Sequence, residues 1–304
     1  MESAGNIAEF LREKSVLVTG STGFLAKIFV EKVLRVQPSV KKLFLLVRAS
    51  DGCSVEERFQ NEVIGKELFD VLREKHGKDF DSFISDKVSA VAGDISYENL
   101  GIKDYGVREQ LWKEVDIVVN VAATTNFYER YDVALGINVM GAKNVLEFAK
   151  QCRKIKMLLH VSTGELYNNN KALNSPRTTS DGKPMKMTAM HVMKTMTDFK
   201  RYMFLRYRLP LEGFRLLNIA CFCLFNKYVN KLWRKYRFVM LLAELYAPYA
   251  FFKGCFDDAN LEKLRVKTRD SMEATLFDFD PKHIEWEDYF CNIHIPGVLK
   301  NVSN

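Results

Sequence analysis

The sequence has few of the residues that build metal sites or disulfide frameworks. Its six cysteines include no C-x-x-C pair, and none of its five histidines forms an H-x-x-x-H pair. This spacing fits neither a zinc site nor a disulfide-stapled secreted domain. We therefore predict no metal, reduced thiols and a cytosol-facing protein.

Leader segments and long apolar runs are also missing. The N-terminal Met1–Gly5 is followed by Glu9 and Glu13, which is too acidic for a transit peptide and leaves no apolar core of signal-peptide length. A membrane-spanning helix needs about 20 apolar residues. The run from Leu216 to Phe225 has about half that length, and Val239–Phe252 contains Glu244 and Pro248. We predict no signal peptide, transit peptide or transmembrane helix.

Positive charge is concentrated in the middle of the chain. Of 304 residues, 47% are apolar and 27% charged, ordinary globular values that exclude disorder and fibrous repeats. The net charge of +7 divides into −1 for residues 1–165, +11 for 166–252 and −3 for 253–304. The basic part could face anionic lipid, a phosphorylated substrate or nucleic acid, or be an ordinary solvated surface. No nucleic-acid motif is visible, so we predict no nucleic-acid partner.

The two apolar runs lie within this basic region. Arginines and lysines crowd around both runs, which suits a helix lying in the membrane interface. Peripheral membrane contact through residues 200–252 is one interpretation of this pattern. The alternative is a buried helix pair with basic outer faces.

The first half alternates short apolar runs with helical periodicity. Runs at 15–19, 43–47, 88–92, 117–121 and 157–161 indicate buried strands, and residues 24–36, 55–75 and 133–152 indicate helices. Nearly uninterrupted apolar strands between helices are typical of a parallel sheet covered on both faces. The predicted fold is α/β, a partial doubly wound Rossmann-like sheet of order 3-2-1-4-5, followed by a mainly helical C-terminal domain.

A glycine-rich turn follows the first predicted strand. It consists of Thr19, Gly20, Ser21, Thr22, Gly23, Phe24, Leu25 and Ala26. Gly20 permits a tight turn, Gly23 lets the backbone approach a pyrophosphate, and Ala26 lets helix and strand pack closely. Because the turn opens a helix, we predict that its free amides hold a dinucleotide's pyrophosphate.

The ends of the other predicted strands point to the same crevice. Arg48 ends the second strand and favours a 2′-phosphate, hence NADPH, whereas Asp51 lies further out. Asp94, followed by Ile95, could bind the adenine amino group, and the small Ala122 and Ala123 would let the cofactor ribose approach. Asn138 could tie strands together or act in the site.

The fifth strand ends at His160-Val161-Ser162-Thr163. A hydroxyl here would lie near a substrate carbonyl, so Ser162 and Thr163 are the candidate carbonyl-binding residues. A histidine on an apolar strand is more often a hydrogen-bonded core residue than a base.

Several segments resemble one enzyme family. TGSTGFLAKIFVEKVLR, LFLLVRAS, VAGDI, VDIVVNVAATTNF and LLHVST are similar to the plant alcohol-forming fatty acyl-CoA reductases, which belong to the extended short-chain dehydrogenase/reductases and are related to the male-sterility proteins. RYMFLRYRLPLEGFRLLNI, LLAELYAPYAFFKGCFDDANLEKLR and FDFDPKHIEWEDYFCNIHIPGVLK resemble that family's C-terminal domain.

This resemblance implies a two-step reduction. A long-chain fatty acyl-CoA would become an aldehyde and then a primary alcohol, using two NADPH. The family's Tyr-x-x-x-Lys pair would supply the proton, the tyrosine pKa being lowered by the lysine and the cofactor ribose. Ser162 or Thr163 would hold the carbonyl oxygen. We expect a lipid-biosynthetic enzyme that faces the cytosol, in association with the endoplasmic-reticulum membrane.

The chain departs from the family pattern after the fifth strand. The family carries its Tyr-x-x-x-Lys helix, further strands and a substrate region there, whereas this sequence runs into Asn168-Asn169-Asn170 and a polar stretch. Two Tyr-x-x-x-Lys strings do occur in this chain. Tyr167…Lys171 encloses three asparagines, which form helix poorly. Tyr249…Lys253 lies beside Pro248 in an aromatic segment whose side chains suggest packing. Tyr202…Arg206 is not equivalent, because arginine stays charged.

Three functions follow from this pattern. The chain is an active NADPH-dependent reductase, or a truncated relative that binds NADP(H) without turnover, or a binding protein for acyl-CoA or a membrane surface. The predicted domains are residues 1–166 for the NADP-binding domain, 167–190 for a polar linker, and 191–304 for the helical domain. The fifth strand would become a sheet edge.

Overall fold

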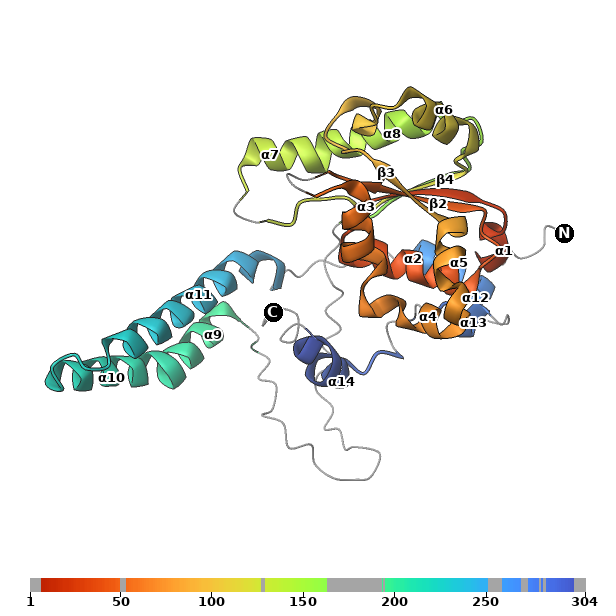
Figure 1. Ribbon diagram of the computed structural model, residues 1–304. Coiled ribbons are helices and arrows are strands. Elements are labelled where there is room, and N and C mark those ends of the chain that lie inside the picture. The colour runs from red at the N-terminus through yellow and green to blue at the C-terminus, as the bar shows by residue number, and fades with distance from the viewer. Residues whose placement is uncertain are drawn as a thin grey trace. The chain divides into compact units, whose positions relative to one another are not determined.

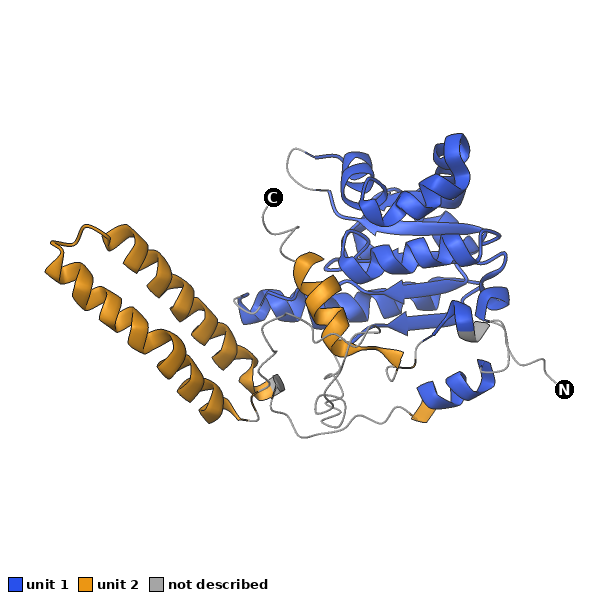
Figure 2. Cartoon of the chain, turned by 90° about the horizontal axis from the view of Figure 1, so that it is seen from below, with its two compact units in different colours: residues 1–163, 261–279 blue, residues 164–260, 280–304 orange. Residues whose placement is uncertain are grey.

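The computed structural model describes residues 7–49, 53–126, 129–162, 193, 195–250, 259–268, 273–278, 280 and 283–297 (Figure 1). The chain forms two compact units, coloured separately in Figure 2. The first comprises residues 1–163 and 261–279, and the second comprises residues 164–260 and 280–304.

The first unit is built on a five-stranded sheet of order β3-β2-β1-β4-β5, as predicted. Its strands are β1 (Ser15–Thr19), β2 (Lys42–Val47), β3 (Val88–Ala92), β4 (Ile117–Asn120) and β5 (Met157–His160). All four pairings are parallel, and the registers bring Thr19 beside Asn120 and Asn120 beside His160. The carboxyl ends of the strands therefore meet at one edge of the sheet.

Helices cover both faces of this sheet (Figure 1). One face carries α1 (Ile7–Leu11), α2 (Phe24–Val36), α3 (Val55–Arg58), η1 (Phe59–Ile64), η2 (Glu67–Phe69), α4 (Asp70–His76), η3 (Gly77–Asp79) and α5 (Phe80–Lys87). The other carries η4 (Glu98–Gly101), α6 (Tyr105–Glu114), α7 (Tyr131–Leu135), η5 (Gly136–Met140) and α8 (Gly141–Gln151). The doubly wound α/β fold is confirmed.

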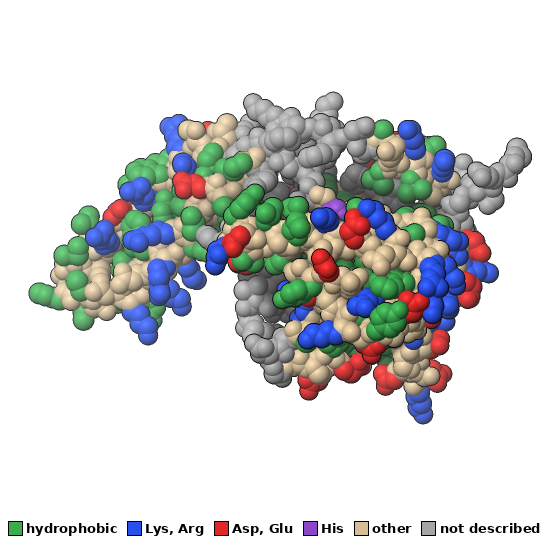
Figure 3. Space-filling model, turned by 90° about the horizontal axis from the view of Figure 1, so that it is seen from above, with side chains coloured by type: hydrophobic (Ala, Val, Ile, Leu, Met, Phe, Trp, Pro, Cys, Tyr) green, Lys and Arg blue, Asp and Glu red, His purple; other side chains and the backbone are tan. Residues whose placement is uncertain are grey.

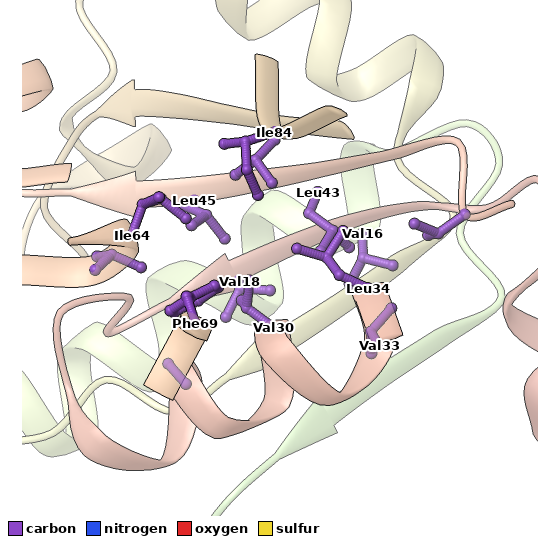
Figure 4. Close-up of a cluster of buried hydrophobic side chains, with 14 of the residues drawn as sticks. Val16, Val18, Val30, Val33, Leu34, Leu43, Leu45, Ile64, Phe69 and Ile84 are labelled. Atoms are coloured by element: carbon purple, nitrogen blue, oxygen red, sulfur yellow. The ribbon is translucent and has the colours of Figure 1, made fainter. Parts of the chain in front are cut away.

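Two hydrophobic cores follow from the alternation of side chains along the strands. Val16 and Val18 of β1 point into the core beneath α2, which Figure 4 shows, whereas Leu17 points into the core beneath α8. Val30 and Leu34 of α2 are fully buried against the first core. A central strand that is apolar on both faces is buried on both faces, and that is why β1 reads as an uninterrupted apolar run.

The predicted helix over residues 55–75 is broken in the structure. The chain turns at Gly65, whose amide donates to the carbonyl of Gln60 over 2.7 Å, and resumes as η2 and α4. A side chain at Gly65 would lie 2.6 Å from that same carbonyl oxygen, so the turn requires glycine. The break lets both segments bury their apolar residues against the sheet.

Helices dominate the described part of the second unit, as predicted for the C-terminal region. They are α9 (Met196–Met203), the π-helical η7 (Phe204–Arg208), α10 (Leu209–Ala220), α11 (Asn226–Ala250), α14 (Trp286–Asp288) and the π-helical η9 (Tyr289–His294). Pro210 lacks the N–H that would bond to the carbonyl four residues earlier, and the π-helical segment immediately before it accommodates that loss.

Two further helices come from the last part of the chain. They are α12 (Ala259–Thr268) and α13 (Glu273–Leu276). Residues 261–279 group with the sheet unit, where the ammonium of Lys32 lies 5.3 Å from the ring centre of Phe277. Within the described residues, no helix combines the length and apolar character needed to cross a bilayer.

Candidate functional site

A pocket of about 450 Å³ opens at the carboxyl ends of β1, β2, β3 and β4. Nine of the predicted cofactor residues line it, namely Gly20, Ser21, Thr22, Gly23, Arg48, Asp94, Ile95, Ala122 and Ala123. In an open parallel sheet, this crevice beside the first strand is where dinucleotides bind. The structure therefore brings together residues that lie up to a hundred positions apart in the sequence.

Gly20 makes the tight turn off β1. Its φ is +67°, in the left-handed region that favours glycine. A Cβ at this position would lie 2.8 Å from both the backbone N and the Cα of Ala122, a distance at which the atoms would collide. The absence of a side chain thus lets the loop after β1 pack directly on the loop after β4.

Gly23 begins helix α2. Its amide donates to the carbonyl of Gly20 over 2.8 Å, and it is the N-cap residue with no side chain to cap the helix. The first turn carries no acidic residue either, so the positive end of the helix dipole is left for an anion. Phe24 and Leu25, by contrast, are 73% and 53% exposed and do not line the pocket.

Thr19 lies beneath the pocket, fully buried, and contributes through hydrogen bonds. Its hydroxyl donates to Oδ1 of Asn120 over 2.6 Å and accepts from the amides of Val121 and Ala122 at 3.3 and 3.2 Å. A side-chain oxygen from β1 thus fixes the start of the loop after β4. The structure gives Thr19 a positioning role and places it outside the pocket lining.

Arg48 stands at the end of β2 with its side chain 63% exposed. Its Nη1 lies 4.0 Å from Oδ2 of Asp94, which ends β3. The other carboxylate oxygen of Asp94 accepts from the amide of Ser96 over 2.8 Å. The guanidinium is therefore available for an anion at the pocket mouth, beside a fixed carboxylate.

Arg58 of α3 also lines the pocket, although no motif in the sequence pointed to it. Its guanidinium donates to the carbonyl of Arg48 over 2.6 Å and to both carboxylate oxygens of Glu62 at 2.7 and 2.8 Å. These hydrogen bonds hold the pKa of Glu62 below its ordinary value. Arg58 thus fixes the backbone that carries Arg48, while its own charge is paired with Glu62.

The loop after β3 shapes the adenine side predicted from Asp94. The amide of Asp94 donates to the carbonyl of Leu100 over 2.7 Å, and Gly93 donates to the carbonyl of Val47 over 3.1 Å. A Cβ at Gly93 would lie 2.5 Å from the Leu100 oxygen. Close backbone packing around Gly93 therefore sets where the Asp94 carboxylate lies.

Asn138 ties the loop after β4 to the helix that follows. Its amide oxygen accepts from the amide of Thr124 over 2.8 Å, and its Nδ2 donates to the carbonyl of Thr124 over 3.1 Å. This paired bond orients the loop that holds Ala122 and Ala123 along the pocket. Asn138 therefore ties a loop to a helix, which differs from the predicted tie between strands.

The end of β5 is only partly described. Nδ1 of His160 lies 3.0 Å from Nδ2 of Asn120, which extends the Thr19–Asn120 hydrogen bond across two strand pairs. Ser162 is exposed and is not among the lining residues. Several residues singled out in the sequence lie outside the described part of the structure. They are Asp51, Thr163, the Tyr167…Lys171 string, Lys253 and the side chain of Tyr249.

The remaining lining residues were not singled out from the sequence. They include Thr124, Thr125, Asn126, Glu129 and Ile137 beside the loop after β4. The amide of Glu129 donates to the carbonyl of Asn126 over 3.1 Å. Thr124, Thr125 and Asn126 follow the end of β4 within six residues, and that position is the sequence signal that could have found them, whereas Ile137 lies further along the chain on η5.

Comparisons with known proteins bear on the whole chain. A family model described as male sterility protein matches residues 18–204, and a second with the same description matches residues 206–304. The alcohol-forming fatty acyl-CoA reductase of Simmondsia chinensis is 33% identical, with all of both chains covered. That alignment spans 494 positions against 304 residues here, so more than a third of its positions have no counterpart in this chain.

Two further matches cover about half of the chain. Fatty acyl-CoA reductase 2, chloroplastic, of Arabidopsis thaliana is 47% identical over 163 residues, which is 54% of this chain and 26% of that one. The reductase domain of a nonribosomal peptide synthetase from Mycobacterium tuberculosis is 30% identical over 50% of this chain and 34% of that one, with a TM-score of 0.39. On the full-length matches, the chain belongs to the male sterility protein family, with the plant alcohol-forming fatty acyl-CoA reductases.

Proposed function

We propose that this chain binds NADPH in the pocket beside β1 and acts on long-chain fatty acyl-CoA. The observation that carries the proposal is the juxtaposition of the uncapped start of α2 with Arg48 at one crevice. A pyrophosphate fits the first feature and a ribose 2′-phosphate fits the second. The close backbone approach at Gly20, where a Cβ would collide with Ala122, brings the loops after β1 and β4 together on this pocket.

The roles of the residues follow from their positions. The amides at the start of α2 would hold the pyrophosphate, and Arg48, supported by Arg58, would hold the 2′-phosphate. Asp94 would accept from the adenine amino group, and the small Ala122 and Ala123 would admit the ribose. When bound, NADPH would supply hydride, one per reduction, to turn the acyl-CoA into an aldehyde and the aldehyde into a primary alcohol.

A second candidate is a relative that binds NADP(H) or acyl-CoA without turnover. Two observations favour it. The described lining of the pocket contains neither tyrosine nor lysine, and the relative's alignment contains positions that this chain lacks. In the reductases that this chain resembles, a tyrosine beside a lysine would donate the proton to the carbonyl oxygen. Ser162 and Thr163 remain the proposed carbonyl-binding residues.

One assay separates the two candidates. Purified protein is mixed with NADPH and a long-chain acyl-CoA, and aldehyde, alcohol and free CoA are measured, while NADPH binding is measured separately by titration calorimetry. Two NADPH consumed and one CoA released for each alcohol formed supports the reductase. Binding of NADPH without product supports the second candidate, and absence of binding refutes both cofactor-dependent proposals.

Further proposals concern the organisation and location of the protein. We propose that residues 1–166 form the NADP-binding domain, with 167–190 as a linker and 191–304 as a helical domain. The +11 net charge of residues 166–252 supports membrane contact through residues 200–252, on the endoplasmic reticulum. Fractionation of cells that express the chain tests the location, since a protein that stays in the high-speed supernatant would contradict it.

A further inference from the structure

The second unit contains a long helical hairpin. Helices α9, η7 and α10 follow one another as one arm, and α11 returns as the other (Figures 1 and 2). Nζ of Lys200 lies 2.9 Å from Oε1 of Glu244, which ties the two arms together far from the turn. At the other end, residues 221–225 make the turn between α10 and α11.

The turn displays large apolar side chains to solvent. Phe222 is 93% exposed and Leu224 is 78% exposed, and Leu216 and Leu217 on the last turns of α10 are 68% and 64% exposed. Single exposed apolar residues need no explanation, but a contiguous group at a protruding turn marks an interaction site. We call residues 216–225 the hairpin tip.

A buried polar residue holds the hairpin tip in shape. Asn218 is 2% exposed, its Oδ1 accepts from the amide of Phe225 over 2.7 Å, and its Nδ2 donates to Oδ1 of Asn226 over 3.0 Å. Its backbone carbonyl accepts from the amide of Cys223 over 2.8 Å. Phe222 and Cys223 have φ values of +54° and +63°, and such left-handed residues persist when their surroundings fix them.

Positive charge lies next to the apolar tip. Lys227, Lys231 and Arg234 stand at i, i+4 and i+7 of α11, and this spacing puts them on one face of the helix. The structure pairs none of these three with an acid in the part of the chain it describes. Figure 3 shows hydrophobic side chains at the end of the hairpin and Lys and Arg side chains along it.

We propose that the hairpin tip inserts into the interface of an anionic lipid bilayer, with the basic face of α11 on the headgroups. An apolar run of about half a membrane span, flanked by lysine and arginine, suits the interface and is too short to cross it. A second copy of the chain is a poorer occupant, because it would bring two surfaces of like charge together. This proposal deepens the membrane contact proposed above by naming the inserting element.

Vesicle flotation of the full chain tests the proposal, without NADPH or acyl-CoA, so that its outcome is independent of the cofactor pocket and of catalysis. The vesicles contain either phosphatidylcholine alone or equal parts of phosphatidylcholine and phosphatidylserine. We expect the double variant F222D/L224D to bind the anionic vesicles at least about tenfold more weakly than wild type. The matched control is V71D/Y131D, which changes side chains 54% and 81% exposed in the sheet unit and should bind like wild type.

The charge contribution is tested with K227Q/K231Q/R234Q. Each lost positive charge should weaken binding to the anionic vesicles by about fivefold, and added salt should reduce the difference from wild type. Binding to pure phosphatidylcholine should not change. Loss of binding that is equal on both vesicle types would contradict the role given to the headgroups.

Two native cysteines give a readout that needs no variant. Cys221 and Cys223 in the hairpin tip are exposed, whereas Cys53 and Cys291 are half-buried. We expect anionic vesicles to protect Cys221 and Cys223 from a water-soluble maleimide, and to leave the labelling of Cys53 and Cys291 unchanged. Unprotected tip cysteines on protein that floats with vesicles would overturn the insertion.

The oligomeric state in solution tests the other occupant of the tip. If the wild-type chain forms concentration-dependent dimers that F222D/L224D abolishes, and does not bind vesicles, the tip would be assigned to a second copy.

Discussion

Nη1 of Arg48 lies 4.0 Å from Oδ2 of Asp94, so the ends of β2 and β3 present a guanidinium and a carboxylate side by side at the pocket. Both side chains are partly solvated, and an exposed pair at this distance stabilises the fold little. The pair is therefore better placed to select a nucleotide than to hold the structure. The guanidinium of Arg48 would attract a ribose 2′-phosphate, whereas the carboxylate of Asp94 would repel it.

Replacing Arg48 with alanine tests the positive member of the pair. We expect NADPH affinity to fall by about tenfold or more, the loss of about one charge-assisted hydrogen bond, while NADH affinity changes little. Titration calorimetry with both nucleotides measures the difference. Arg153→Ala is the control, since that arginine is 62% exposed and pairs with Glu109 away from the pocket. Equal losses for NADH and NADPH would show that Arg48 does not read the 2′-phosphate.

Replacing Asp94 with asparagine tests the negative member. The side-chain oxygen can still accept from the amide of Ser96 and from an adenine amino group, so the loop is expected to keep its shape. Removal of the carboxylate charge beside Arg48 should raise NADPH affinity by a few-fold at low salt. The same titration in added salt should show the gain shrinking. A large loss of both nucleotides would instead make the Asp94 charge essential.

Replacing Gly20 with alanine tests the turn off β1. The φ of +67° and the 2.8 Å approach to Ala122 leave no room for a methyl group. We expect the free energy of unfolding to fall by about 1–3 kcal/mol and nucleotide binding to be lost. Gly213→Ala is the matched control, because that helical glycine has nothing within 4 Å of an added Cβ. It should leave binding intact and raise stability by about 0.5–1 kcal/mol. Urea unfolding of both variants measures the contrast.

Replacing Thr19 with valine tests the buried hydroxyl beneath the pocket. The amides of Val121 and Ala122 and the side chain of Asn120 would lose their shared partner, at a cost of about 1–3 kcal/mol. NADPH affinity should also fall, because the loop after β4 would no longer be fixed. Thr19→Ser keeps the hydroxyl and should retain binding. If valine binds NADPH as well as serine does, the hydroxyl is not what positions the loop.

The sequence was sufficient for the sheet and for the residues that stand directly at strand ends. Apolar runs and the glycine turn are local signals, and they gave the strand order and placed Gly20, Arg48 and Asp94 at one edge. Arg58 could not be found in this way, because it lies ten residues beyond Arg48 on a helix and reaches the pocket only when that helix folds back. The same holds for the hairpin tip, whose exposure depends on the pairing of α10 and α11.

Cys152 links burial to the pH dependence of stability. It is 3% exposed at the end of α8, and burial raises the pKa of its thiol to about 12. As the pH rises above the ordinary thiol pKa, the unfolded chain loses this proton first, so the free energy of unfolding falls with a slope of about 1.4 kcal/mol per pH unit. Cys152→Ala removes the titrating group. We therefore expect the stability advantage of wild type over Cys152→Ala to be about 1.5 kcal/mol smaller at pH 10 than at pH 8, as measured by urea unfolding. The other titrating groups are common to both proteins, so they cancel in the difference, and an advantage that does not change with pH would mean that the thiol is not held in its neutral form.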